Sequence, residues 1–506
     1  MILPRRPNSG GRVAANTVPA SLALLPALVL ALWPASDARA LPEGNTIEFE
    51  NCTLTLPGTP ATAPARCGFL EVPEDPADPD GRRIRLHVAV GEAGSQTPAP
   101  DPLFFFAGGP GQAASETWVM LRSALRKLRK NRDIVMIDQR GTGQSNRLAC
   151  ESAQLDDLGA AIDYDRLAEE AQACLADLDG DPRFYTTTIA MQDIDRVRRA
   201  MGYEQINLLG VSYGTRAAQV YLRRFPETVR SVVLDSVVPM QLALGQEHAP
   251  MLDVAVERVL ADCERDETCS ALYPNQRGEL NALAAELRAR PRALTITHPV
   301  TGRPETLTMS AEVLAVAIRF LSYTSESQAM LPLLVHEALA TGDLERIASQ
   351  ALIVMAGLSE ALARGMELSV MCSEDYPFMN LGADQSDTLL GDVMLRVFEA
   401  QCGVWPRGEV PDDFHEPVVS DVPVLLLSGE RDPVTPPRYA EQAAETFSDS
   451  LHLVARGQAH SVMSHRCVQE VITRFVEAGA TERLDTGCMA DVEAAPFFTS
   501  LLGPAP

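Results

Sequence analysis

Apolar and polar residues follow two distinct patterns along this chain, and each pattern predicts a different secondary structure. Short, almost continuous apolar runs are typical of strands buried on both faces of a sheet, as in "PLFFFAGG", "RDIVMIDQ", "INLLG", "SVVLD" and "VPVLLLSG". Segments with an apolar residue at every third or fourth position, such as 215–224, indicate helices. Strands that alternate with helices predict an α/β fold with a mainly parallel sheet and right-handed crossovers.

The pattern changes before and after these runs. Residues 81–90 alternate between polar and apolar after the turn "DPADPDG", which predicts a hairpin with an edge strand. From 240 to 421 the helical period predominates, and strand character returns only with "VPVLLLSG" and "SLHLVA". We therefore expect a core in two parts, 41–239 and 422–506, with a mostly helical insertion at 240–421.

The first forty residues have the composition of a targeting segment. Arg5, Arg6 and Arg12 give it a basic start, residues 18–33 are apolar, and residues 38–40 ("ARA") fit a small-x-small cleavage site. A membrane anchor is the alternative, but the apolar stretch is short for a spanning helix and contains Pro26. We expect 1–40 to be a cleaved signal peptide, with the mature protein periplasmic or secreted and free of the membrane.

Export changes how the charge and the cysteines are interpreted. The formal net charge is −25, and loss of the signal, with four arginines and one aspartate, takes it to −28. Such a surface disfavours nucleic acid as a partner. All ten cysteines follow the signal, and an even number in an exported chain predicts disulfides.

Sequence alone leaves the connectivity of the bridges open, but pairing neighbours along the chain is the simplest scheme. Paired C-x-x-C spacing and histidine clusters are missing from the sequence, so we expect no metal or other cofactor. The expected pairs are Cys52–Cys67, Cys150–Cys174, Cys263–Cys269, Cys372–Cys402 and Cys467–Cys488.

Candidate chemistry centres on "INLLGVSYGTRAA", where a buried strand meets a helix. The segment contains G-x-S-x-G, with Ser212 between Gly210 and Gly214. At a strand-to-helix junction this motif forms a strained turn that presents the serine as a nucleophile, and the small residues let the helix pass close to the strand. An ordinary glycine-rich turn is the alternative, so the assignment depends on partners elsewhere in the chain.

A serine nucleophile needs a base and an acid, which in this topology follow it in the order Asp or Glu, then His. Asp432 follows the strand "PVLLLSG", and His460 follows the strand "LHLVA". Both therefore lie on loops at the carboxyl edge of the sheet, where Ser212 also lies. Asp235, at the end of an earlier strand, is the competing acid in a variant arrangement.

A tetrahedral intermediate at Ser212 would also need two amide donors. Tyr213, directly after the nucleophile, supplies one, and we assign the other to Gly109 in "AGGPG", because glycine lets the backbone approach a substrate closely. A tight turn that serves only the fold is the alternative for this loop.

The motifs "FFFAGGPGQ", "DQRGTGQS", "GVSYGTRAA", "SGERDPVTPP" and "GQAHSV" resemble the exported tripeptidyl aminopeptidase and proline iminopeptidase branch of the α/β-hydrolases. The resemblance spans about residues 67–490. It implies an α/β-hydrolase sheet with helices on both faces, a large and mostly helical inserted cap, and cleavage of peptides from a free amino end. Ala107 stands where the family often has histidine before Gly-Gly-Pro-Gly, which departs from strict proline iminopeptidases.

An aminopeptidase must hold the α-ammonium of its substrate, and a carboxylate in the cap can do so. In "ELSVMCSEDYP" the resemblance favours Glu374 as this anchor and Asp375 as second choice, with a solvated acidic turn as the alternative. The sequence thus predicts a serine aminopeptidase that acts through an acyl-enzyme. Two other functions remain open: a secreted esterase or lipase on the same fold, and a non-catalytic binding protein derived from a hydrolase.

Overall fold

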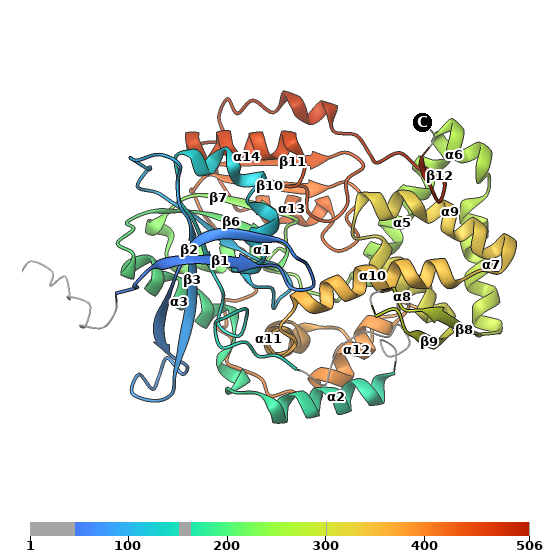
Figure 1. The fold of residues 1–506 in the computed structure, drawn as a ribbon, viewed down its shortest axis with the longest axis horizontal. Helices are drawn as coiled ribbons and strands as arrows, with labels where there is room; N and C mark the ends of the chain where they lie inside the picture. The colour runs from blue at the N-terminus through green and yellow to red at the C-terminus, as the bar shows by residue number, and fades with distance from the viewer. Residues whose placement is uncertain (1–45, 151–162, 300, 505–506) are drawn as a thin grey trace, which may run out of the picture. The chain divides into compact units, whose positions relative to one another are not determined.

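The structure is a computed structural model that describes residues 46–150, 163–299 and 301–504, and the predicted signal peptide at 1–40 lies outside the described residues. At its centre is a nine-stranded sheet (Figure 1). The first three strands are antiparallel to their neighbours, and the strands from β5 onward are parallel. The spatial order is β1 (Glu50–Thr55), β2 (Thr62–Pro73), β3 (Arg83–Gly91), β5 (Ile134–Ile137), β4 (Leu103–Phe106), β6 (Ile206–Val211), β7 (Val229–Asp235), β10 (Val424–Gly429) and β11 (Ser450–Ala455).

The expectation of an edge strand at 81–90 is wrong. β3 pairs with β2 on one side and with β5 on the other, and β1 forms this edge of the sheet. The alternating pattern misleads because His87, a polar residue, is buried between Leu86 and Val88. Its Nδ1 lies 3.0 Å from Asp138 Oδ2, so the polar position is satisfied inside the protein rather than by solvent.

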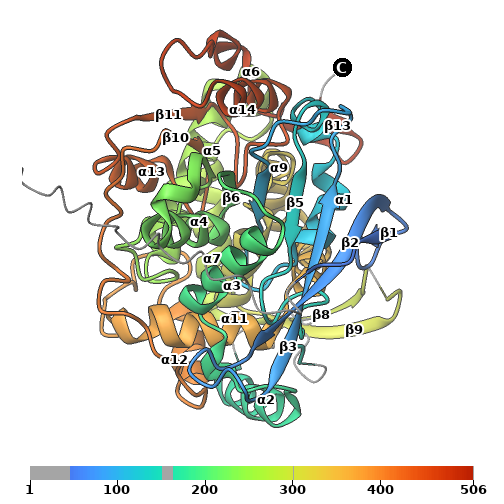
Figure 2. The same ribbon diagram turned by 90° about the vertical axis from the view of Figure 1, so that its left-hand side faces the viewer.

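Helices cover both faces of the sheet, as predicted. On one face α3 (Thr187–Ala200), α4 (Tyr213–Arg224) and α13 (Pro437–Ala444) pack on alternate strand residues, and Figure 2 shows α3 and α4 side by side in front of the sheet. On the other face α1 (Ala114–Leu121) and α14 (Arg466–Ala478) pack on the intervening residues. Because both faces of the sheet are buried under helices, the central strands are apolar at almost every position.

The segment 240–421 is mostly helical and has a hydrophobic core of its own. It also contains a hairpin that the helical expectation missed, β8 (Arg292–Thr297) and β9 (Pro304–Met309), whose alternating threonines were the available signal. We call this segment the cap. Its helices are α5 (His248–Arg265), α6 (Glu267–Leu272), α7 (Gln276–Ala289), α8 (Ala311–Leu321), α9 (Ser325–Thr341), α10 (Glu345–Ala361), α11 (Arg364–Val370) and α12 (Val393–Cys402).

Two segments from outside 240–421 also pack on the cap. Helix α2 (Tyr164–Asp177), which lies between β5 and α3 in the sequence, packs against α12 (Figure 1). Near the carboxyl terminus, β12 (Phe498–Ser500) packs against α6 and α9. These two packing contacts add to the covalent links at the two ends of the cap.

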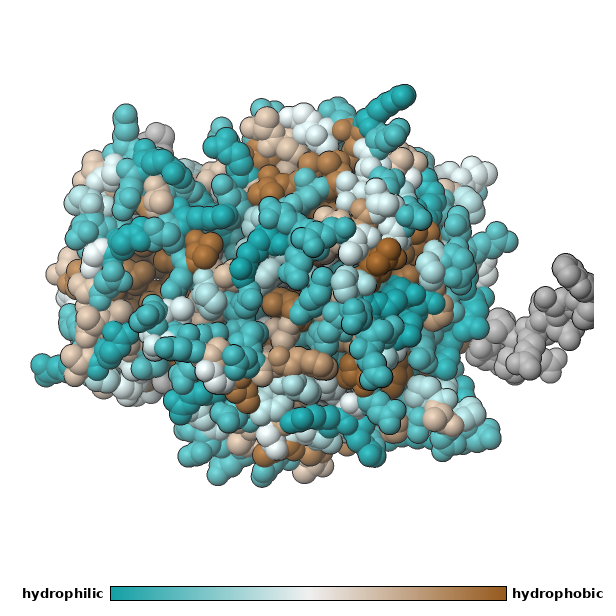
Figure 3. All heavy atoms as spheres, turned by 180° about the vertical axis from the view of Figure 1, so that it is seen from behind, coloured by the Kyte–Doolittle hydropathy of each residue, from teal (hydrophilic) through white to brown (hydrophobic). Residues whose placement is uncertain are grey.

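All five predicted disulfide pairs are present, and the described residues contain no free cysteine. The Cys150–Cys174 and Cys372–Cys402 bridges share one buried cluster, which joins α2, α12 and the segment after α11. None of the helices in the described part of the chain is both long and apolar enough to cross a membrane. On the face shown in Figure 3, hydrophilic residues predominate and hydrophobic ones form small separate patches.

Candidate active site

Ser212 occupies a strained turn between β6 and α4. Its backbone has φ 56° and ψ −125°, in the region that non-glycine residues rarely adopt. A Cβ at Gly210 would lie 2.3 Å from Gly214 O, and a Cβ at Gly214 would lie 2.2 Å from Phe106 O. Both positions therefore require glycine, as the motif predicts. The turn leaves Ser212 partly exposed at the carboxyl end of the strand.

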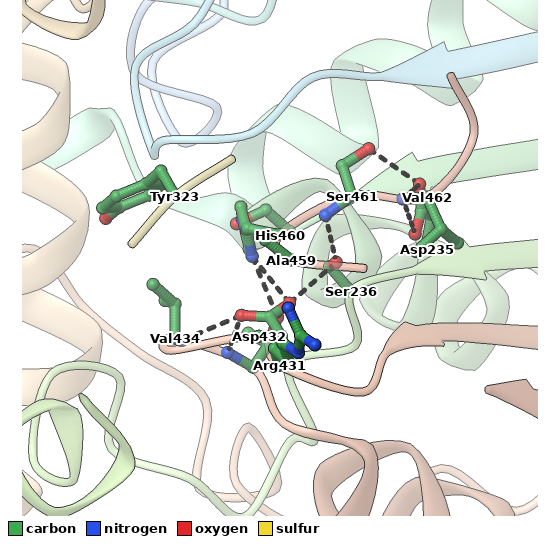
Figure 4. Close-up of polar contacts among 12 residues, drawn as sticks. Asp235, Ser236, Tyr323, Arg431, Asp432, Val434, Ala459, His460, Ser461 and Val462 are labelled. Carbon is green, nitrogen blue, oxygen red and sulfur yellow. Dashed lines mark hydrogen bonds and ion pairs between the residues drawn. The ribbon is translucent and has the colours of Figure 1, made fainter. Parts of the chain in front are cut away.

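Asp432 and His460 meet directly, as Figure 4 shows. His460 Nδ1 lies 2.8 Å from Asp432 Oδ2. The Asp432 carboxylate also accepts the Val434 N–H and the Thr435 N–H, each at 2.8 Å, and the Ser236 hydroxyl at 3.0 Å. The loop after β10 thus orients the carboxylate, and the carboxylate orients the imidazole.

The electrostatics of this pair suit a base that must become positively charged. Burial by itself raises the pKa of the Asp432 carboxyl. The charge and the hydrogen bond of His460 outweigh this effect, and the net pKa is lowered to about 2. Burial lowers the pKa of His460, yet Asp432 more than offsets this, and the net pKa is raised. Asp432 therefore stabilises the imidazolium that forms when His460 accepts a proton.

Asp235, the competing acid, does not contact the His460 ring. Its backbone oxygen accepts the Ser212 N–H at 2.9 Å, and its carboxylate accepts the Ser461 hydroxyl at 2.8 Å and the Val462 N–H at 3.0 Å. Asp235 thus links the turn at Ser212 to the residues that follow His460, and Figure 4 shows its contacts with Ser461 and Val462. The position of Asp235 supports a structural role, because the Nδ1 atom of His460 is already hydrogen-bonded to Asp432.

The structure does not join Ser212 and His460 by a hydrogen bond, since Ser212 Oγ has no hydrogen-bond partner among the described residues. The two predicted amide donors are also unoccupied: neither Gly109 N nor Tyr213 N donates to any described residue. The glycine loop lies against the nucleophile, because a Cβ on Gly108 would lie 3.3 Å from Ser212 Cβ. The glycine loop and the turn at Ser212 are therefore neighbours, and the Ser212 hydroxyl and the two amides have no partner among the described residues.

The cap holds the loops of both the base and the acid. Tyr323 O accepts the His460 N–H at 3.2 Å, and Ser325 Oγ accepts the N–H of the preceding residue at 3.0 Å. Gln328 Nε2 donates to Arg431 O, directly before Asp432, at 2.9 Å. Tyr323 and the first turn of α9 therefore hold the loops of His460 and Asp432, a contact that sequence reasoning did not foresee.

Asp375 lies in an interior ion pair rather than on a cap surface. Its Oδ1 accepts Arg216 Nη1 at 2.6 Å and the Leu244 N–H at 2.7 Å, and neither charged side chain is exposed. Arg216 belongs to α4, the helix that begins after the nucleophile. The ion pair ties that helix to the cap, and this position leaves Asp375 no surface for a substrate.

Glu374 is also fully buried, at 0% exposure. Its carboxylate accepts the Thr187 N–H at 2.5 Å and the Thr187 hydroxyl at 2.7 Å, and that hydroxyl lies 2.6 Å from the Tyr213 hydroxyl. Burial raises the pKa of Glu374 to about 8 despite these hydrogen bonds. At neutral pH the group is therefore largely protonated, and it lacks the fixed negative charge that an ammonium anchor needs.

Sequence reasoning missed a third carboxylate in the same string, Glu367 in α11. Its side chain is 21% exposed and pairs with Arg364. The residues before α11 lie on the glycine loop: the Ala363 N–H donates to Gly111 O at 2.9 Å, and a Cβ on Gly109 would lie 2.9 Å from Leu362 Cδ2. This places α11 directly over the candidate oxyanion loop.

The charge of Glu367 also affects Tyr323, which lies next to His460. It is one of the causes that raise the pKa of Tyr323, after burial and the charge of Asp432. The Tyr323 ring lies edge-on to His460, with centroids 5.6 Å apart. Glu367 is therefore a partly exposed carboxylate whose charge acts on Tyr323, the neighbour of His460.

Other candidate chemistry is not found at this site. His465, the next histidine after His460, accepts the Cys467 N–H and caps α14. Among the described residues, no group of three or more His, Cys, Asp or Glu side chains could hold a metal ion.

Comparison with known proteins gives a consistent set of relatives. Residues 101–464 match the family described as alpha/beta hydrolase fold. The chain is 24% identical over 85% of its length to YuaR of Escherichia coli (strain K12), covering 90% of that protein. It is 26% identical to the tripeptidyl aminopeptidase of Streptomyces coelicolor, over 89% of this chain and 87% of that one. It is 25% identical to the serine protease Hip1 of Mycobacterium tuberculosis (strain ATCC 25618 / H37Rv), over 88% and 91%.

Proposed function

The chain belongs to the alpha/beta hydrolase fold family, in the branch of the tripeptidyl aminopeptidases and proline iminopeptidases, and from that premise we propose that it is an exported serine aminopeptidase. It would release single residues or short peptides from a free amino end. The observation that carries the proposal is the buried Asp432–His460 pair beside the strained turn of Ser212. The five disulfides support export.

In the proposed reaction, Ser212 Oγ attacks the carbonyl carbon of the scissile bond, and His460 takes its proton. Asp432 stabilises the imidazolium through the hydrogen bond to Nδ1. The free N–H groups of Gly109 and Tyr213 receive the negative oxygen of the tetrahedral intermediate. His460 then protonates the leaving amine, and water hydrolyses the acyl-enzyme by the same steps.

The restriction to free amino ends needs a negative charge near this reaction centre. We place it on Glu367 rather than on Glu374 or Asp375, because the latter two are sealed inside the protein. Glu367 is partly exposed and belongs to α11, and the residues just before this helix contact the glycine loop. Glu367 already pairs with Arg364 on the same helix, so a substrate ammonium would have to join or displace that cation.

Two other functions compete with this proposal. An esterase or lipase would use the same three residues, since esters and amides share the tetrahedral route. A charged group at the position proposed for Glu367 favours a peptide over an acyl chain. A non-catalytic binding protein would have no need of the strained Ser212 backbone or of two unoccupied amides.

The test compares free and acetylated peptide-coumarin substrates with p-nitrophenyl acetate. For Glu367→Gln we expect kcat/KM on free peptides to fall about ten- to a hundredfold, since a charge-assisted hydrogen bond contributes about 1.5–3 kcal/mol. Hydrolysis of acetylated peptide and of the ester should hardly change. Glu374→Gln serves as the matched control. If Glu374→Gln shows the amine-specific loss and Glu367→Gln does not, the anchor lies at residue 374.

A further inference from the structure

Two polar side chains of the cap, Arg319 in α8 and Tyr323 after it, lead to His460. A third, His248 at the start of α5, lies near enough for the charges of Arg319 and His460 to lower its pKa. We call the three side chains the cap-floor cluster. Arg319 Nη1 donates to the Tyr323 hydroxyl at 2.9 Å, and its guanidinium lies 5.4 Å from the Tyr323 ring centroid. The same ring lies edge-on to His460. None of the three takes part in the proposed acyl-transfer steps.

Arg319 has no counter-ion. Across the described residues, no carboxylate lies within ion-pair distance of its guanidinium, although the chain has 68 acidic and 43 basic residues. Its positive charge acts on the site, where it opposes the rise in the pKa of His460. A partly buried cation without a partner, beside a catalytic base, is costly unless a ligand supplies the negative charge.

His248 is the second unpartnered group. It is 9% exposed, and within the described chain its ring makes no hydrogen bond. Burial lowers its pKa well below the usual value, and the charges of Arg319 and His460 lower it further. The ring is therefore neutral at neutral pH, with one N–H to donate. His248 also opens the eighteen-residue helix α5, whose positive end attracts anions.

We propose that Arg319 and His248 form a subsite that binds a carboxylate of the substrate beside the catalytic centre. Arg319 supplies charge and donors in a fixed orientation, because the Tyr323 hydroxyl holds one end of its guanidinium. The His248 N–H would supply a further donor from α5. A carboxylate in this place gives Arg319 its missing counter-ion and His248 its missing hydrogen-bond partner.

The inference rests on the proposed function and names its substrate class: peptides that carry a carboxylate close to the scissile bond. That carboxylate has two possible sources. It can be the side chain of Asp or Glu next to the bond, or the carboxyl terminus of a short peptide on the leaving side.

The experiment uses three matched substrate pairs that differ by one carboxylate. The first pair is a peptide-coumarin with Glu or Gln at the residue whose carbonyl is attacked. The second is a short unlabelled peptide with a free or an amidated carboxyl terminus. The third, p-nitrophenyl hemisuccinate against p-nitrophenyl acetate, requires no peptidase activity, so it tests the subsite even if the aminopeptidase proposal fails.

For the wild type we expect the carboxylate-bearing member of at least one pair to have the higher kcat/KM. Arg319→Met should lower kcat/KM for that member about ten- to a hundredfold and leave the uncharged member within twofold. Tyr323→Phe keeps the ring against His460 but removes the hydroxyl that holds Arg319. It should lower the ratio of kcat/KM between the charged and uncharged members, by less than Arg319→Met does. The matched control is Arg303→Met in the exposed β8–β9 turn, which should not change the ratio.

Two results would overturn the subsite. One is a wild type that shows no preference for the carboxylate in any of the three pairs. The other is an Arg319→Met variant that slows both members of every pair equally, because Arg319 would then serve only to hold Tyr323 against His460. A wild type that removes no residues from free amino ends but prefers hemisuccinate would retain the subsite and reject the aminopeptidase proposal.

Discussion

Replacing Asp375 by Asn removes the charge of one partner in a fully buried ion pair and changes the side chain's size very little. Arg216 keeps its contacts to Pro239 O and Leu242 O but loses its only counter-ion within the described chain. Removing one partner of a buried pair typically costs about 3–5 kcal/mol, because the remaining charge is left uncompensated. Against a total stability of about 5–15 kcal/mol, this is a large fraction.

The assay is equilibrium unfolding in urea with the disulfides intact, together with kcat/KM on free peptide and ester. Asp375→Asn should lose about 3–5 kcal/mol in the free energy of unfolding, and activity should fall equally on both substrates, since the pair ties α4 to the cap. Arg216→Met combined with Asp375→Leu removes both charges and should recover much of the loss.

The opposite result would refute a structural role for Asp375. If Asp375→Asn unfolds at the same urea concentration as the wild type but loses activity only on free peptides, then Asp375 contacts the α-ammonium. Failure of the double variant to recover stability would show that the cost lies in packing rather than in the uncompensated charge.

Three further predictions concern Glu374, Ser325 and the Asp432–His460 pair. The pKa of Glu374 is near 4.5 in the unfolded chain and about 8 in the folded protein. Its contribution to the free energy of unfolding is therefore complete below pH 4.5 and is lost as pH rises through 8. In Glu374→Gln, the free energy of unfolding measured in urea should accordingly vary less between about pH 5 and 8 than in the wild type. Ser325→Ala should lower kcat about two- to tenfold with little change in KM, equally on ester and peptide, and Ser325→Thr should restore it. Because Asp432 raises the pKa of His460, the acid limb of kcat/KM should have a midpoint above 6.5, and Asp432→Asn should move that midpoint down while reducing kcat.

The parts of the site that sequence reasoning located are those that depend on local order. Ser212, Asp432 and His460 each follow a strongly apolar strand, and parallel strands bring their carboxyl ends to one edge whatever the details of packing. The glycines around Ser212 are required by backbone contacts under 2.5 Å, which the motif encodes directly. The disulfide pairing could be predicted because each bridge joins two cysteines that are neighbours along the sequence.

The parts that escaped prediction depend on contacts between distant segments. The burial of Glu374 requires Thr187, and that of Asp375 requires Arg216, each more than 150 positions away. Likewise, Ser325 reaches the histidine loop only because the cap folds back on the core. A residue's type shows that it can carry a charge, whereas its burial and partners decide whether that charge is available to a substrate.

The most direct measurement is product mapping by mass spectrometry. A ten-residue peptide with a free amino end and its N-acetylated twin are incubated with wild type and with Ser212→Ala. We predict that wild type shortens the free peptide stepwise from its amino end and leaves the acetylated twin intact. Ser212→Ala should lose several orders of magnitude in rate on the free peptide, because the three residues act as a unit. Internal cleavage, equal cleavage of the twin, or near-native activity of Ser212→Ala would contradict a serine aminopeptidase built on Ser212, His460 and Asp432.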